Sequence, residues 1–314
     1  MKKLILSFLA ALLAATVQAQ SPFQGTAMKV KTGGEKGTYH AMFANLIETC
    51  GPLEEELSPG GSEENVEALI ANKASAAFVQ SDVLFFWDNN VKKLDNVRTV
   101  YALHNEEVHF ATPVQTRFHK SEYGGLKKTD IAFNQVADLA GQPVGAVGGS
   151  KYTAEFISQK GNLNLQIRQF ASNDELRGAM ERGEIAAGIY VGGQPLGSVE
   201  ALGAGFKLLP FNEMLISALS RWYEPAKLSY PKMGAKGTPT IAAEALLVGR
   251  TLNNQEKVKQ FAALRDCITQ HLGDLQDNGH PKWQDVKAEN RGKWTWYELP
   301  STKPATVTKV AKKK

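Results

Sequence analysis

Four glycine-rich segments of the sequence each lie just before a predicted helix. They occupy residues 32–38, 58–62, 148–153 and 192–195. The first N–H groups of a helix lack an intrahelical partner and carry partial positive charge, and glycine lets a ligand approach the backbone closely. A single glycine-rich turn is explained by the backbone needs of the turn itself. Four of them in one chain favour a cleft that binds a small anion through main-chain amides.

Side chains in and beside these turns are the candidate ligand contacts. They offer hydroxyl, amide, phenol and ammonium groups, and with one glycine amide the set is Gly37, Thr38, Tyr39, Ser62, Asn65, Ser81, Ser150, Lys151, Tyr152 and Thr153. Backbone N–H groups at 37–38 and at 150–151 are expected to hold a carboxylate from opposite sides. Two interpretations stay open for Lys151, an ion pair with the ligand or a solvated surface lysine. Asn65 either contacts the ligand or braces its own turn.

Motifs for nucleotide binding or hydrolysis do not occur in the sequence. No turn is followed by Gly-Lys-Ser/Thr at the spacing of a phosphate-binding loop, and neither Gly-x-Gly-x-x-Gly nor Gly-x-Ser-x-Gly is found. The histidines do not have the spacing of a helical metal pair, and structural or surface roles are preferred for His40, His104, His109 and His119. The sequence therefore predicts no catalytic residue, no metal site and no cofactor.

The two cysteines, Cys50 and Cys267, fall in separate predicted helices that are far apart in the chain. A disulfide between them would tie the two ends of the chain together. Two separate buried thiols are the alternative, and the sequence leaves both open.

The spacing of hydrophobic residues predicts the helices and strands that position these turns. Phe43, Leu46, Ile47 and Cys50 fall at the i, i+3, i+4, i+7 spacing of one helix face. Short apolar runs read as strands, and strands alternate with helices along much of the chain. This alternation predicts a mostly parallel sheet, with the turns at the carboxyl ends of the strands lining a crevice.

Length and composition set the class of protein. The chain has 314 residues, which suggests two domains, and 43% hydrophobic and 22% charged residues are typical of a globular protein. With 36 Lys and Arg against 32 Asp and Glu, the net charge of +4 is too small to indicate nucleic-acid binding.

The N-terminal segment reads as an export signal. A basic start is followed by an apolar run over residues 4–17 and by small residues before Gln20, which predicts a signal peptide over residues 1–19. No cysteine lies near the expected cleavage point, so we expect a periplasmic protein without a lipid anchor. Residues 301–314 are lysine-rich and non-periodic, and are interpreted as a basic flexible tail.

Several blocks of the sequence resemble a known family. Thr32-Gly33-Gly34-x-x-Gly37-Thr38-Tyr39 is similar to the opening motif of the TAXI family of TRAP-transporter substrate-binding proteins. Further blocks follow in the same order, with a looser match near 238–248; they lie at 61–83, 101–109, 136–150 and 183–195. The family's fourth block usually reads Gly-x-Gly-Ser-Gly-Thr, whereas this chain carries the bulkier Lys151 and Tyr152 within 148–153.

The resemblance implies a type II periplasmic-binding-protein fold, with two α/β lobes joined by hinge strands around a ligand. Lobe I is expected over residues 20–110 plus 238–300, and lobe II over 111–237. The implied function is a periplasmic receptor that closes like a Venus flytrap on a small organic anion, resembling glutamate or oxoglutarate, and delivers it to a TRAP-type membrane permease. Neither enzymatic turnover nor nucleic-acid binding is expected.

Three other functions remain as alternatives at this point. The same fold could serve a sensor or partner protein instead of a permease, or could support an exported enzyme. The late tryptophans Trp283, Trp294 and Trp296 could form a carbohydrate platform, although packing of the C-terminal segment is the simpler interpretation.

Overall fold

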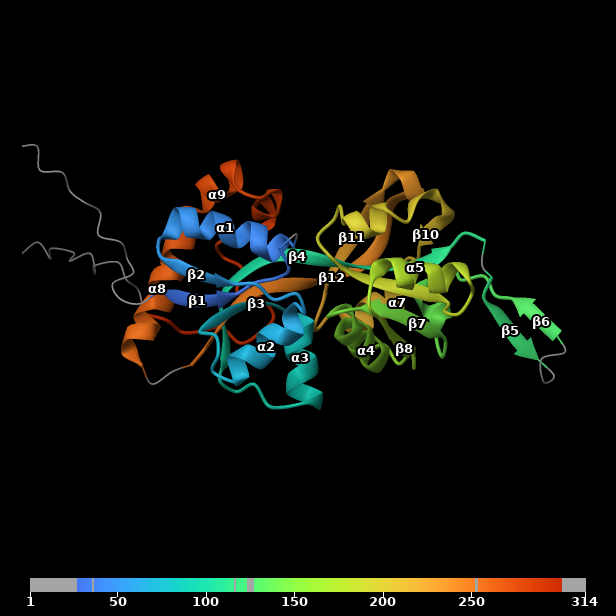
Figure 1. Cartoon of the computed structure of the whole chain (residues 1–314), viewed down its shortest axis with the longest axis horizontal. Helices are drawn as coiled ribbons and strands as arrows, with labels where there is room; N and C mark the ends of the chain where they lie inside the picture. Colours follow the sequence, from blue (N-terminus) through green and yellow to red (C-terminus); the bar gives the residue numbers. More distant parts are fainter. Residues whose placement is uncertain (1–26, 36, 116, 123–126, 252–253, 301–314) are drawn as a thin grey trace, which may run out of the picture.

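The computed structural model describes residues 27–35, 37–115, 117–122, 127–251 and 254–300. The expected signal peptide (1–19) and basic tail (301–314) lie outside these residues. The described chain forms two α/β lobes side by side, and two long strands pass through both of them (Figure 1). These strands are β4 (Val97–Pro113) and β12 (Ala235–Arg250), which pair antiparallel with each other. The predicted type II periplasmic-binding-protein fold is therefore confirmed in its architecture.

The first lobe is built from both ends of the described chain. Its N-terminal elements are β1 (Met28–Lys31), α1 (Thr38–Cys50), β2 (Leu53–Glu56), α2 (Ser62–Ile70), β3 (Ala76–Gln80) and α3 (Ser81–Asn90). Its C-terminal elements are α8 (Gln255–Gln270), α9 (Leu272–Asn278) and the 3-10 helix η5 (Pro281–Asp285). The strand order is β2-β1-β3-β12-β4, in which β1 runs parallel to β2 and β3.

The second lobe comes from the middle of the chain. Its strands are β7 (Pro143–Val147), β8 (Gln166–Phe170), β9 (Ala187–Gly192), β10 (Phe206–Leu208) and β11 (Glu224–Tyr230). Its α-helices are α4 (Ser150–Lys160), α5 (Asn173–Glu181), α6 (Gly197–Glu200) and α7 (Glu213–Leu219). The described residues of this lobe also form the 3-10 helices η2 (Val136–Leu139), η3 (Gly203–Gly205) and η4 (Pro231–Met233). A separate hairpin of β5 (His119–Glu122) and β6 (Lys127–Asp130) projects from its far end (Figure 1).

Each lobe combines a parallel sheet with the two long antiparallel strands. In the second lobe, β7 pairs parallel with β8 and β9, and β9 pairs antiparallel with β4. The parallel prediction thus holds within each lobe but not for the strands that join them. The turn at 192–195 was expected to open a helix, and α6, which follows it, has only four residues.

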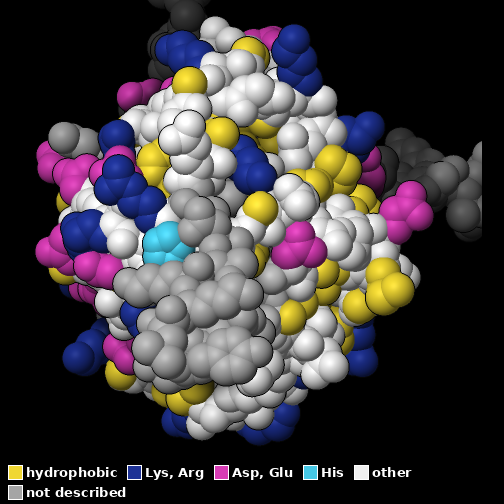
Figure 2. Space-filling model, turned by 90° about the vertical axis from the view of Figure 1, so that its right-hand side faces the viewer, with side chains coloured by type: hydrophobic (Ala, Val, Ile, Leu, Met, Phe, Trp, Pro, Cys, Tyr) yellow, Lys and Arg dark blue, Asp and Glu magenta, His cyan; other side chains and the backbone are white. Residues whose placement is uncertain are grey.

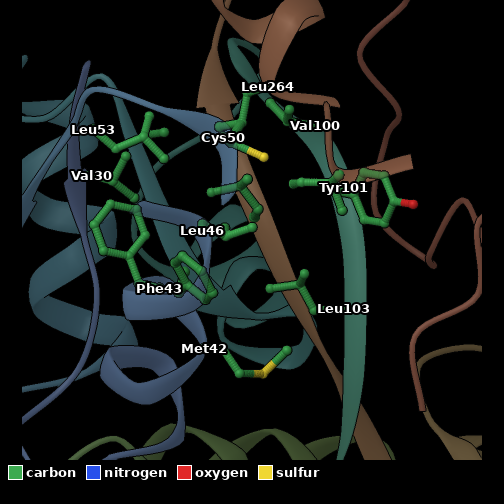
Figure 3. Close-up of a cluster of buried hydrophobic side chains, with 14 of the residues drawn as sticks. Val30, Met42, Phe43, Leu46, Cys50, Leu53, Val100, Tyr101, Leu103 and Leu264 are labelled. Atoms are coloured by element: carbon green, nitrogen blue, oxygen red, sulfur yellow. The ribbon is translucent and has the colours of Figure 1, made fainter. Parts of the chain in front are cut away.

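Hydrophobic side chains on α1 explain why that helix packs where it does. Met42, Phe43 and Leu46 are fully buried on one face of α1, and Figure 3 shows them against strands of the first-lobe sheet and α8. The expected apolar face is confirmed, except that Ile47 is 38% exposed.

The packing of the long strands changes from one lobe to the other near their centres. Along β4, Leu103 belongs to a first-lobe core and Val108 to a second-lobe core. Along β12, the same change occurs between Ala243 and Ala245. The strands therefore pass from lobe to lobe within a few residues of each other.

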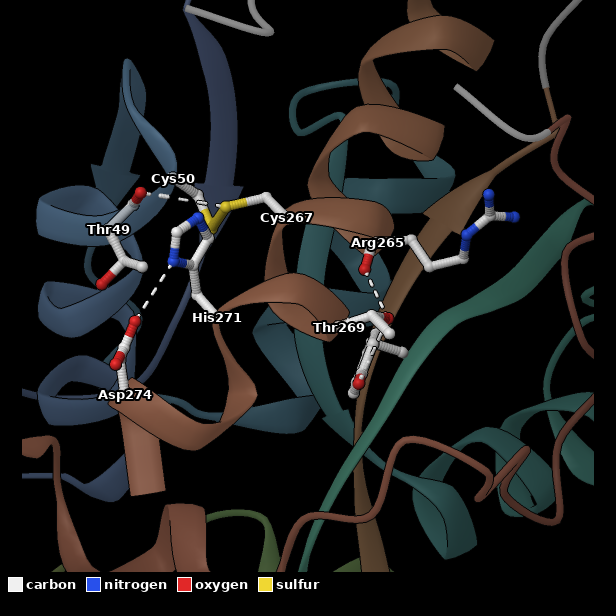
Figure 4. Close-up of a disulfide and its surroundings, with 8 residues drawn as sticks. Thr49, Cys50, Arg265, Cys267, Thr269, His271 and Asp274 are labelled. Carbon is white, nitrogen blue, oxygen red and sulfur yellow. Dashed lines mark hydrogen bonds and ion pairs between the residues drawn. A yellow bond between two sulfur atoms is a disulfide. The ribbon is translucent and has the colours of Figure 1, made fainter. Parts of the chain in front are cut away.

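The cysteines form a disulfide that joins α1 to α8. The Cα atoms of Cys50 and Cys267 are 5.8 Å apart, and the bond links positions 217 residues apart in the sequence. Figure 4 shows the bond between the two helices. Of the two alternatives left open by the sequence, the structure contains the bridge, which ties the N-terminal and C-terminal segments of the first lobe together.

The face at the far end of the second lobe has a mixed surface. On its described atoms, basic, acidic and hydrophobic side chains are interspersed, and the hydrophobic ones form small separate groups (Figure 2). Such scattered apolar side chains are normal for a protein surface.

Candidate functional site

A small pocket lies between the two lobes, at the place where the sequence analysis expected the ligand. Its volume is about 160 Å³. The first lobe contributes residues from α1, the α2 turn and β3, the second lobe contributes the start of α4 and the end of β9, and β4 crosses between them. The lining residues are Tyr39, Gly61, Ser62, Gln80, Glu106, Gly149, Ser150 and Val191.

Two helices direct their N-terminal ends at this pocket, one from each lobe. Helix α2 begins at Ser62 and α4 begins at Ser150, and both serines line the pocket. The turns before them need glycine, because Gly61 has φ +65° and Gly148 has φ +52°. These values lie in the left-handed region that residues with a Cβ rarely adopt. The pocket therefore receives first-turn amides and partial positive charge from both sides.

Three of the predicted contact residues line the pocket: Tyr39, Ser62 and Ser150. The Ser62 hydroxyl accepts a hydrogen bond from the Gln80 N–H at 3.0 Å, so it also fixes the end of β3. Gln80, at the end of β3, lines the pocket as well.

Two other predicted residues brace backbone next to the pocket. The Asn65 amide donates hydrogen bonds to the carbonyls of Thr32 at 2.6 Å and Phe78 at 2.7 Å, which joins the ends of β1 and β3. The Ser81 hydroxyl accepts a hydrogen bond from the Glu244 N–H at 3.1 Å. This contact joins the start of α3 to β12.

The amides expected to hold a carboxylate are partly engaged within their own turns. The Gly37 N–H donates to the Gly34 carbonyl at 2.7 Å, and the Lys151 N–H donates to the Gly148 carbonyl at 3.2 Å. Thr38 is half-buried at the start of α1 and does not belong to the pocket lining.

The two bulky residues of the α4 turn, Lys151 and Tyr152, follow the pocket residue Ser150 and contact other side chains. The Lys151 amine is 3.9 Å from Glu155 and 5.5 Å from the ring centre of Tyr152. The Tyr152 hydroxyl donates a hydrogen bond to Glu63 of α2, so this side chain connects the two lobes. Thr153 is fully buried behind it. Neither Lys151 nor Tyr152 belongs to the pocket lining, so the two bulky side chains do not fill the pocket.

Glu106 is a charged pocket residue that lies in the 101–109 block but is not among the ligand contacts expected from the sequence. It lies on β4 near the change of lobe and is 6% exposed. One carboxylate oxygen accepts a hydrogen bond from the Tyr39 hydroxyl at 3.1 Å, and the other lies 3.5 Å from Nε2 of His104. The signal available in the sequence was a pair of acids, Glu106 and Glu107, close to the apolar residues 100–103 and 110–111, because buried acids are rare unless they are paired or functional.

Tyr39 is held as a hydrogen-bond donor in the pocket. Burial and the neighbouring Glu106 carboxylate raise its pKa well above the usual value near 10. The phenol therefore keeps its proton at any physiological pH, and it orients the Glu106 carboxylate towards the pocket.

A second set of polar contacts surrounds the long strands. Burial lowers the pKa of His109 to about 4, so the ring is neutral, and it lies between the Tyr190 carbonyl at 3.3 Å and the Tyr230 hydroxyl at 2.9 Å. Burial raises the pKa of Glu107, whose carboxylate accepts the Gln194 N–H at 2.8 Å. These contacts fit the structural role expected for His109.

Asp82 connects the first turn of α3 to the second lobe. It is fully buried, and its carboxylate accepts hydrogen bonds from the Val83 N–H and from the Tyr223 hydroxyl, each at 2.9 Å. Burial raises the pKa of Asp82 to about 6, against the lowering effect of the hydrogen bond from Tyr223.

Within the described part of the chain, no group of three His, Cys, Asp or Glu side chains is placed to hold a metal ion. The described helices also include none that is both long and apolar enough to cross a bilayer.

Comparisons with known proteins give likenesses of fold at low identity. No family model matches the chain. One similar structure is a periplasmic binding protein of an arginine transport system from Legionella pneumophila, at 10% identity over 80% of this chain and 95% of that chain, with a TM-score of 0.46. Another is the substrate-binding protein of an amino acid ABC transporter, at 10% identity over 82% and 100% of the two chains, with a TM-score of 0.47. A Candida albicans protein described as having the generic periplasmic binding protein fold gives 10% identity, 84% and 78% coverage, and a TM-score of 0.48. The resemblance to the TAXI family is not confirmed by these comparisons.

Proposed function

We propose that this protein is a solute-binding receptor that closes its two lobes over a small amino acid. The observation that carries the proposal is the pocket between the lobes, which combines two helix N-terminal ends with one buried carboxylate, Glu106. Helix ends favour a carboxylate, and Glu106 favours an ammonium group. A zwitterion satisfies both, whereas a dicarboxylate without an amino group brings like charge to Glu106.

The size of the pocket supports a small ligand. About 160 Å³ is below the ~300–1,000 Å³ range of drug-sized sites. This volume supports a metabolite of the size of glutamate and disfavours a polymer such as a carbohydrate chain. Within the pair named by the family resemblance, it is the charge of Glu106 that favours glutamate over oxoglutarate.

Closure would be a hinge motion of one lobe against the other. The packing of β4 and β12 favours a hinge near residues 104–107 and 243–245, a few residues from the boundaries expected at 110 and 238. The contact between Tyr152 and Glu63 and the ring pair Phe86–Tyr152, whose centres are 5.1 Å apart, already join the lobes in this structure and would break as the lobes open.

Export to the periplasm and delivery to a TRAP-type permease complete the proposal. The basic and apolar pattern of residues 1–19 supports export, and the ordered motif blocks support the permease. A receptor of this kind performs no turnover, so the ligand is expected to be recovered unchanged after incubation. Uptake of the ligand by proteoliposomes that carry the permease, dependent on this protein, would test the partner; a sensor partner would give no uptake.

Calorimetry on the mature protein tests the ligand class. We expect L-glutamate or another amino acid to bind, and 2-oxoglutarate to bind at least about tenfold more weakly, because it lacks the ammonium group. Glu106→Gln should weaken amino-acid binding by at least about tenfold and remove this preference. Glu48→Gln, which changes an exposed acid on α1, is the matched control and should leave both affinities unchanged. Oxoglutarate binding as tightly as glutamate would contradict the proposal, as would a panel of amino acids in which none binds.

A further inference from the structure

A second hollow between the lobes is separate from the ligand pocket. It has a volume of about 390 Å³ and shares no lining residue with that pocket. It lies on the side where α3 and α4 face each other in Figure 1. Phe85 and Trp294 contribute walls from the first lobe, and Lys160 and Trp222 contribute walls from the second.

Three cations in this hollow have no carboxylate partner. Arg98 donates to the Val97 carbonyl at 2.9 Å, and the Lys160 amine and the Arg221 guanidinium lie 5.4 Å and 5.7 Å from the ring centre of Trp222. Within the described residues, no ion pair joins any of the three to an aspartate or glutamate. A fourth cation, Lys293, is paired with Glu224 at 2.7 Å.

The acids of the hollow do not neutralise these cations. Asp88 accepts hydrogen bonds from the Leu94 N–H at 2.8 Å and the Lys93 amine at 2.9 Å, so it is already engaged. Asp95 also lines the hollow and is exposed to solvent. Among the described residues, the hollow therefore contains three cations without a carboxylate partner and one acid, Asp95, without a cationic partner. Arg98 belongs to the first lobe, and Lys160 and Arg221 belong to the second.

We propose that this hollow is a second binding site, which takes a small, multiply charged anion and holds the two lobes against each other. The geometry suits that ligand class because arginine forks and a lysine point charge are the side chains that bind phosphate and carboxylate oxygens. A volume of about 390 Å³ lies within the range of small-molecule sites. A bound polyanion would replace the missing carboxylate partners and would bridge cations from both lobes.

Isothermal calorimetry at fixed ionic strength tests the site, with inorganic pyrophosphate and citrate as the two probes. Saturable binding of one probe or both to the mature protein is expected, and the probe that binds more tightly distinguishes a phosphate from a polycarboxylate ligand. The double variant Lys160→Gln/Arg221→Gln should weaken binding by at least about tenfold. Arg98→Gln, from the other lobe, should do the same if the anion bridges the lobes.

A matched double variant separates this site from general charge attraction. Lys236→Gln/Lys259→Gln also removes two positive charges, at exposed positions outside the hollow, and should leave the affinity unchanged. Equal losses in both double variants, or no saturable binding of either probe, would overturn the proposal. Glu106→Gln should not weaken polyanion binding, so its effect on amino-acid binding tests the proposed function independently.

Discussion

The two lobes have a similar α/β architecture but are built from the chain in different ways. The first lobe is assembled from two chain segments, one before β4 and one after β12, and the disulfide between Cys50 and Cys267 joins them. The second lobe is formed mainly by the continuous chain between the long strands and contains no covalent link. A lobe made of two distant segments must close a long loop when it folds, and a covalent bond reduces that entropic cost. We therefore expect the disulfide to stabilise the first lobe more than the second.

Removing the disulfide is the largest test of this difference. Cys50→Ser/Cys267→Ser should lower the free energy of unfolding by about 2–5 kcal/mol, because the bond closes a long loop in the unfolded chain. Hydrogen exchange should lose protection in α1 and α8 and keep it in β7 and β9. Chemical reduction of the unmodified protein should reproduce the effect. Equal loss of protection in both lobes would show that the bond stabilises the molecule as a whole.

Local sequence patterns account for much of this architecture. The apolar face of α1 and the glycine turns before α2 and α4 can be read from neighbouring residues, because helix caps and amphipathic faces are local properties. The residues at which the long strands pass from one lobe to the other are harder to predict from the sequence. Their pairing partners lie far away in the sequence, so no local signal marks where one core ends and the other begins.

The site illustrates the same limit. Tyr39, Ser62 and Ser150 were predicted because each follows a glycine turn, and they line the pocket. Glu106 was not predicted, since its position depends on where β4 crosses between the lobes. The second hollow was also not predictable, because its cations come from three distant parts of the chain and only the tertiary fold brings them together.

The contact between the lobes is sensitive to pH at Asp82. Its pKa is raised from 3.8 to about 6 by burial, so the folded protein binds the proton more tightly than the unfolded chain. Its contribution to stability is therefore fully present below pH 3.8 and is lost as the pH rises through 6. The difference corresponds to on the order of 3 kcal/mol. Asp82→Asn should remove this dependence, so its stability relative to the unmodified protein should increase between pH 4.5 and pH 7.5 in urea denaturation. A constant difference across that range would contradict a raised pKa at Asp82.

The second lobe, without a covalent link, depends on close packing instead, and Gly145 on β7 tests this. A Cβ at this position would lie 2.3 Å from Leu176, 2.6 Å from Ile185 and 2.7 Å from Phe170, so the surrounding side chains would have to move. Gly145→Ala should therefore cost about 1–3 kcal/mol, the usual range for overpacking a core. Gly205→Ala, in the same lobe, meets no atom within 4 Å and is the matched control. If hydrogen exchange finds that Gly145→Ala loosens β7 and β9 while α1 and α8 keep their protection, the two lobes hold their stability separately; a loss spread over both lobes would mean that the long strands couple them.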